Sequence, residues 1–170
     1  AAAAILNPKR PDCDYPFDAL AGVGVAFKLI LALAIKNGLK TTDVFNQYVD
    51  IATLGTIADV VPLLGENRVI VDKGLKILHN PKRIGIRAIM EVAGVLDKPL
   101  NVSTIAFSIA PRLNAAGRLG SAATAVELLL TNDESRAREL ALLLDTENKE
   151  RQQTERQIFD EALELIAKDP

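Results

Sequence analysis

The chain has 170 residues, of which 49% are hydrophobic, and a formal net charge of −2. This is enough apolar sequence for one ordinary domain or parts of two, and the charge argues against a globally basic nucleic-acid-binding protein. The single cysteine, Cys13, excludes an intrachain disulfide and a Cys-based zinc site, and it fits a reducing, cytoplasmic location.

The first residues predict the end of a strand that enters an irregular loop. Residues 1–6 are apolar and are followed by Asn7 and Pro8, and residues 7–17 contain three prolines. The chain does not begin with methionine, so we expect a fragment whose N-terminal half is missing. The identity of the four initial alanines stays open, because they could stand for unassigned side chains.

Four helices are predicted in the first hundred residues. Residues 19–35 are apolar except for Lys28 but too short for a usual membrane span, so they predict a buried helix. Start and stop signals define the expected elements. They are a helix from Asp18 to Lys36 stopped by Asn37 and Gly38, one from Thr41 to Asp59, one over 66–78 capped by His79, and one over 84–92 closed by Gly94.

A carboxylate interrupts the apolar stretch LGTIADVVPL at 54–63. An ionised carboxylate among apolar residues is costly unless a cation or hydrogen-bond donors hold it. Two interpretations of Asp59 are open. It is either a solvated residue at a helix end or a metal ligand that the helix end presents.

A second stretch with potential chemistry covers residues 108–120. It places Arg112, Asn114 and Arg118 among small residues that leave room for a ligand. Arginine forks match phosphate oxygens, and asparagine offers both a donor and an acceptor. Basic residues also outnumber acidic ones between 82 and 118, which favours a local basic patch. The alternative is a surface turn with solvated arginines.

The C-terminal part predicts a short helix over 121–130 and a very long one over 133–168, because neither contains glycine or proline. Residues 131–134 have the form of a capping box led by Thr131. No apolar residue occurs between 145 and 157. A helix that is polar all round usually crosses solvent between domains, so we expect a linker to a further domain.

Several of these motifs resemble the RecJ single-strand-specific exonucleases of the DHH phosphoesterase superfamily. The matching stretches are NPKR at 7–10, YPF at 15–17, LAGVGVAFKL at 20–29, LGTIADVVPL at 54–63 and APRLNAAGRLG at 110–120. The last two stretches together are specific. The glycine pair at 22 and 24 alone is not, and plain helix packing explains it better than phosphate binding.

The resemblance implies a two-lobed parent with an active site between an α/β DHH lobe and a DHHA1 lobe. Residues 1–120 would be the later, helical part of the DHH domain, and residues 121–170 would lead into the connecting helix. The implied activity is hydrolysis of single-stranded DNA from the 5′ end to mononucleotides with Mn²⁺ or Mg²⁺. Asp59 matches a metal-ligating aspartate, and Arg112, Asn114 and Arg118 match a motif with expected phosphate contacts.

The sequence also departs from this family. The earlier aspartate motifs, the Asp-His-His triplet and the DHHA1 domain do not occur in the chain. Divalent ions each need several oxygen or nitrogen ligands, so we expect this chain alone to be inactive. Two alternatives remain: a DHH phosphodiesterase acting on short oligonucleotides or cyclic dinucleotides, and a non-catalytic replication scaffold. Expected partners are single-stranded DNA, the rest of the protein, and a single-strand-binding protein or helicase.

Overall fold

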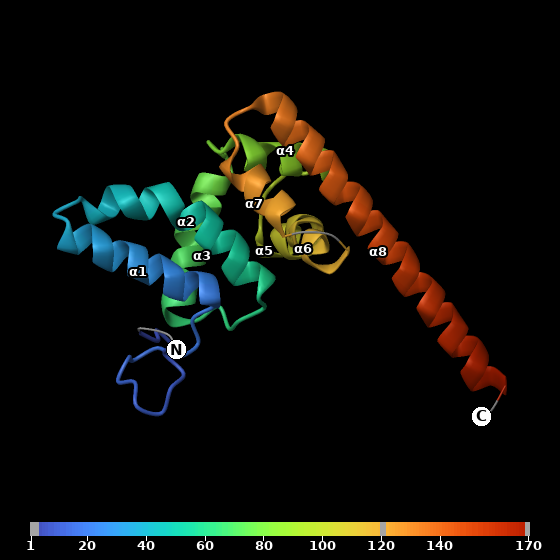
Figure 1. Ribbon diagram of the computed structural model, residues 1–170, viewed down its shortest axis with the longest axis horizontal. Helices are drawn as coiled ribbons and strands as arrows, with labels where there is room; N and C mark the ends of the chain where they lie inside the picture. The colour runs from blue at the N-terminus through green and yellow to red at the C-terminus, as the bar shows by residue number, and fades with distance from the viewer. Residues whose placement is uncertain (1–3, 120–121, 169–170) are drawn as a thin grey trace. The chain divides into compact units, whose positions relative to one another are not determined.

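The computed structural model describes residues 4–119 and 122–168, with the side chains of residues 118 and 119 left out (Figure 1). All regular structure in these ranges is helical, which confirms the predicted helical fold and the long C-terminal helix. Residues 4–7 form no strand, and residues 1–3 lie outside the described part. The chain divides into two compact units: unit 1 contains residues 1–81 and 99–110, and unit 2 contains residues 82–98 and 111–170. The predicted domain boundary at 120 stays a prediction.

Unit 1 is built on three helices, of which α2 packs against both α1 and α3 (Figure 1). The helices are α1 (Gly22–Lys36), α2 (Thr41–Ala58) and α3 (Gly65–Leu78). The short α5 (Val102–Thr104) leads into the π-helical turn η1 (Ile105–Ile109), which packs against α2. The core is apolar and consists of Leu20, Phe27, Val49, Ala52 and Ile70.

The helix stops in unit 1 are as predicted, but one start is not. Asn37 and Gly38 end α1, with Gly38 at φ +67°, and the His79 ring lies 2.8 Å from the Leu75 carbonyl at the end of α3. However, α1 begins at Gly22 and not at Asp18. Its start is delayed because Asn67 donates to the Ala19 carbonyl and holds that segment outside the helix. Helix α2 begins at Thr41, as predicted, with Lys40 as its N-cap residue.

Helix α1 is only partly buried, in contrast to the fully buried helix that its composition predicts. Gly24, Phe27 and Ala34 lie inside unit 1, whereas Leu29, Leu33 and Ile35 are exposed. The reason is that α1 packs mainly against α2, along one side of the helix. No helix in the described ranges is long and apolar enough to cross a membrane.

Unit 2 packs α4 (Ile84–Val92) and α7 (Ala123–Leu130) against α8 (Glu134–Lys168), and it also contains most of α6 (Ala110–Leu119). Gly85 permits a close approach of α4 to α7, because a Cβ there would lie 1.7 Å from the Leu128 carbonyl oxygen. The core of the unit consists of fully buried side chains on α4, α7 and α8: Ile86, Ile89, Met90, Leu128, Ala137, Leu140, Ala141 and Leu144.

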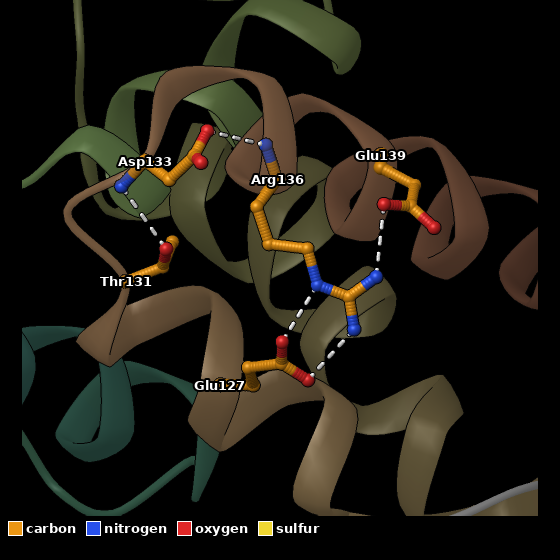
Figure 2. Close-up of polar contacts among 5 residues, drawn as sticks. All are labelled: Glu127, Thr131, Asp133, Arg136 and Glu139. Atoms are coloured by element: carbon orange, nitrogen blue, oxygen red, sulfur yellow. Dashed lines mark hydrogen bonds and ion pairs between the residues drawn. The ribbon is translucent and has the colours of Figure 1, made fainter.

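The turn between α7 and α8 is capped differently from the predicted capping box. The Asp133 carboxylate accepts from the Arg136 amide at 3.0 Å, and the Asp133 amide donates to the Thr131 hydroxyl at 3.1 Å (Figure 2). Asp133 is therefore the cap, two residues after Thr131. The Arg136 side chain contacts both Glu127 on α7 and Glu139 on α8. This arginine joins the two helices on the side of the turn.

Helix α8 is unbroken over 35 residues, as predicted, but its polar middle is not uniformly in solvent. Asp145 and Asn148 are buried, and they continue the buried stripe of Ala137, Leu140, Ala141 and Leu144 at helical spacing. From Gln152 to Lys168 every residue is exposed. The solvent-crossing interpretation therefore fails for the start of the polar stretch and describes only its later part.

Helices α2 and α3 meet where Gly74 faces Thr53, and this contact yields a prediction. A Cβ at position 74 would lie 1.8 Å from Thr53 Oγ1 and 2.8 Å from the Val49 carbonyl oxygen. We expect Gly74→Ala to lower the free energy of unfolding by about 1–3 kcal/mol or more, because the backbones cannot separate without losing packing. Chemical denaturation measures this. Gly22→Ala is the control, since nothing lies within 4 Å of its Cβ position; an equal loss there would contradict the steric explanation.

Candidate functional site

Asp59 lies at the C-terminal end of α2, as predicted. Its amide donates to the Gly55 carbonyl at 3.0 Å, and its side chain is exposed. Among the described residues no side chain pairs with its carboxylate. The arrangement presents an ionisable oxygen donor to solvent at a helix end, which both interpretations of the sequence allow.

The backbone after Asp59 is strained. Val60 adopts φ +56° and is 87% exposed. A β-branched residue in the left-handed region is a conformational outlier, and such outliers persist only where the surroundings determine them. The α2–α3 connection is therefore not relaxed at the residue that follows Asp59.

Contacts at the start of α3 hold this connection in place. Asn67 is fully buried and donates through Nδ2 to the carbonyls of Pro62, at 3.0 Å, and Ala19, at 2.7 Å. Gly65, at φ +48°, packs so closely on the Phe17 ring that a Cβ there would lie 2.8 Å from it. Asn67 and Phe17 together fix the backbone between Asp59 and α3.

A polar cluster ties the proline-rich loop and α1 to the same helix start. Glu66 accepts from Tyr15 Oη and from Lys28 Nζ, each at 2.6 Å. Burial alone would raise the pKa of Glu66, but these two hydrogen bonds outweigh it and the pKa lies below its usual value. Burial and the Glu66 contact raise the pKa of Tyr15. Because three segments meet at Glu66, the stretches at 7–17 and 20–29 support the geometry around Asp59.

The described residues do not form a metal centre by themselves. No group of three or more His, Cys, Asp or Glu side chains in the described ranges is placed to hold an ion. Asp59 offers the hard oxygen donor that Mn²⁺ and Mg²⁺ prefer, but one carboxylate does not satisfy either ion. The residues present thus fit a single ligand and not a site.

The second stretch is helical over residues 108–119 and not a turn. The π-helical turn η1 ends with the Ala110 amide donating to the Ile105 carbonyl. Pro111 follows, and it cannot continue the hydrogen-bond pattern because it has no N–H. Short π-helical segments often mark functional positions. The motif residues therefore follow an irregular helical turn on α6.

The structure places the three candidate residues of α6 in different environments. Asn114 is exposed, and the neighbouring Gly117 faces open space. Arg112 is largely buried and donates from Nε to Asp145 Oδ1 at 2.8 Å. The side chain of Arg118 lies outside the described part of the chain. Asp59 belongs to unit 1 and this helix mostly to unit 2, so their contribution to one site stays a prediction.

Asp145 is a residue that the sequence did not single out. It is 6% exposed, and its second oxygen, Oδ2, lies 2.7 Å from Lys149 Nζ. Burial alone would raise the pKa of Asp145, but Lys149 and Arg112 more than compensate and hold that pKa below its usual value of 3.8. The sequence signal that could have identified Asp145 is its helical spacing. It lies one residue after Leu144, within the buried stripe of α8.

Comparison with known proteins gives consistent results. No protein-family model matches the chain. Curated relatives named single-stranded-DNA-specific exonuclease RecJ are 44% identical over 96% of the chain in Bacillus subtilis, 45% over 95% in Haemophilus influenzae and 41% over 99% in Escherichia coli. The chain spans only 20%, 29% and 31% of these relatives.

Solved structures agree with the sequence comparison. A crystal structure of exonuclease RecJ bound to manganese covers 84% of the chain with 40% identity and a TM-score of 0.75, and the match spans 35% of that protein. RecJ from Thermus thermophilus in complex with Mg²⁺ covers 89%, with 40% identity and a TM-score of 0.74, over 23% of that protein. The chain is thus similar to one helical segment of metal-binding exonucleases. Over the region that it spans, the resemblance to the RecJ family is confirmed.

The buried ion pair at Asp145 leads to a prediction about pH. A carboxylate whose pKa is lowered in the folded state contributes stability that is complete above the unfolded pKa, about 3.9, and is lost as the pH falls through the folded value. We expect Asp145→Asn to cost about 2 kcal/mol of unfolding free energy near neutral pH. The difference from wild type should shrink as the pH falls below about 4. Urea denaturation across a pH series tests this.

The matched control is Asp160→Asn on the exposed part of the same helix, which should change stability little at any pH. A difference for Asp145→Asn that stays constant down to acid pH would contradict the ion-pair explanation.

Proposed function

We propose that the protein carrying this chain is a metal-dependent exonuclease that hydrolyses single-stranded DNA from the 5′ end to mononucleotides. The relatives' names state a single-stranded-DNA-specific exonuclease, and the similar structures hold Mn²⁺ or Mg²⁺. The observation that carries the proposal is the exposed Asp59 carboxylate on a helix end that Asn67 and Phe17 hold in one conformation.

In this proposal Asp59 is one oxygen ligand of the metal site, and the remaining ligands come from outside the chain. Bound divalent ions would activate water and stabilise the leaving oxygen. The chain's own contribution is one exposed carboxylate next to a backbone that Asn67 and Phe17 hold in place. Its exposure and its lack of a partner among the described residues support this role, because a ligand must be available to the ion.

Helix α6 would bind the sugar-phosphate backbone of the DNA. Asn114 is exposed beside the open surface at Gly117, which suits a contact with substrate. Arg118 is proposed as a phosphate contact from its place in the matched motif. Arg112 belongs to the same motif, but its Nε donates to Asp145. We therefore propose that Arg112 mainly stabilises the position of α6 and contributes less to DNA contact.

We also propose a cytoplasmic location and a role in DNA repair and recombination. The single cysteine suits a reducing compartment, and single-stranded DNA is an intermediate of both processes. Interaction with a single-strand-binding protein or a helicase is part of the same expectation, since either would supply the substrate.

Replacement of the proposed ligand tests the metal site. We expect Asp59→Asn in the intact protein to lower Mn²⁺-dependent release of nucleotides by at least about 100-fold, because loss even of an outer-shell partner of a metal ligand costs 10- to 100-fold. Stability should be unchanged, since the side chain is exposed. The assay follows nucleotide release from a labelled single strand. Asp43→Asn, an exposed aspartate on the same helix, is the control, and near-normal activity of Asp59→Asn would remove it from the site.

Salt dependence tests the contact with phosphate. We expect Arg118→Ala to weaken binding of a single strand measured in EDTA and to reduce the slope of log affinity against log salt by about 0.7, as for one lost phosphate contact. Arg138→Ala provides the control, because Arg138 is an exposed arginine of α8 outside the motif. An unchanged slope for Arg118→Ala would mean that this arginine does not contact phosphate.

A further inference from the structure

Asp145 is the residue of α8 whose position the proposed function does not explain. Its side chain is 9% exposed, although it lies in a helical stretch without apolar residues. Both carboxylate oxygens are engaged: Oδ1 accepts from Arg112 Nε at 2.8 Å, and Oδ2 lies 2.7 Å from Lys149 Nζ. A buried carboxylate is tolerated only when it is paired in this way.

The two cations play different parts in the cluster. Lys149 is on the same helix as Asp145, one turn later, and its side chain is 71% exposed. It therefore compensates charge without joining elements. Arg112 comes from α6, and its side chain is 17% exposed. The Asp145–Arg112 pair is thus the contact of this cluster that connects α6 to α8.

This contact restrains the orientation of α6 about its own axis. Ala115 and Ala116 are fully buried, whereas Asn114 and Gly117 are exposed. Small alanine side chains allow close packing but do little to prevent rotation or sliding of a helix. A charge-assisted hydrogen bond to a planar guanidinium does restrict both, because its geometry is directional.

We propose that Asp145 is a positioning residue for nucleic-acid binding, which acts through Arg112 to keep the exposed face of α6 in its binding orientation. The inference rests on the proposed function, because it requires α6 to contact a single strand. It assigns to Asp145 a role opposite to that expected from its charge, since a carboxylate near DNA normally weakens binding.

The charge of Asp145 and its proposed positioning role have opposite effects on DNA binding, and this difference provides the test. Removing a negative charge without other effects should strengthen binding to a polyanion or leave it unchanged. Loss of a positioning contact should weaken binding. We expect Asp145→Asn in the intact protein to weaken binding of an oligothymidylate single strand about ten-fold. The measurement uses fluorescence anisotropy in EDTA, so that neither metal nor cleavage contributes.

Two comparisons exclude a general effect of charge or stability. Asp160→Asn removes the same charge from an exposed position of α8 and should not weaken binding. The double variant Arg112→Gln with Asp145→Asn should bind no more weakly than Arg112→Gln alone, because Arg112→Gln already removes the contact to Asp145. Circular dichroism at the assay temperature establishes that each variant is folded. Stronger binding by Asp145→Asn, or losses of the two single variants that add, would overturn the proposal.

Arg112→Lys keeps the proposal testable if Asp145→Asn does not fold. This variant leaves the net charge unchanged and replaces the planar guanidinium, including the Nε that donates to Asp145, by a single ammonium group. We expect binding about five-fold weaker, and unchanged affinity would overturn the proposal.

Failure of this inference and failure of the proposed function give different results. If Asn114→Ala and Arg118→Ala weaken binding while Asp145→Asn behaves like Asp160→Asn, α6 contacts DNA and only the role of Asp145 is wrong. If neither α6 variant changes binding, the proposed function of α6 itself fails.

Discussion

A buried carboxylate must be paired, and in unit 2 this requirement joins the two helices on which the proposed binding face depends. Asp145 is buried on α8, and the cation that reaches it from another helix is Arg112 on α6. Arg112 in turn would be costly to bury without an acceptor. The Asp145 carboxylate and the Arg112 guanidinium therefore stabilise each other in their positions. This pairing connects α6, with its exposed Asn114, to α8.

Unit 1 uses neutral polar contacts for a comparable purpose. Asn67 binds two carbonyls from different connections, and Phe17 covers Gly65. These contacts hold a backbone that contains a strained valine at position 60. Strain at one residue and close support around it are typical of positions where a side chain must be presented in one orientation. Asp59 is the ionisable residue next to that strain.

The helical architecture could be read from the sequence where local signals act alone. Asn37 with Gly38, and Gly94, stop helices because glycine adopts positive φ without cost, and α8 is long because nothing interrupts it. The helix starts were less predictable. Asp18 and Thr131 are good caps by composition, yet Asn67 holds the segment after Asp18 outside α1, and Asp133 caps α8. A local rule gives the residue types that can cap, and the tertiary contacts select among them.

The sequence by itself determined the order of α1 to α4, α7 and α8 and the motifs that carry the similarity to RecJ, because helix periodicity and stop signals depend on neighbouring residues. It did not predict the helical path through α5, η1 and α6. It also identified Asp59, Arg112, Asn114 and Arg118 as candidates. Only the tertiary structure separated half-buried Arg112 from exposed Asn114 and revealed Asp145 and Asn67. The physical reason is that the partners of these groups are distant in the chain: Asp145 follows Arg112 by 33 residues, and Asn67 follows Ala19 by 48. Pairing across such distances is decided by packing and not by sequence neighbours.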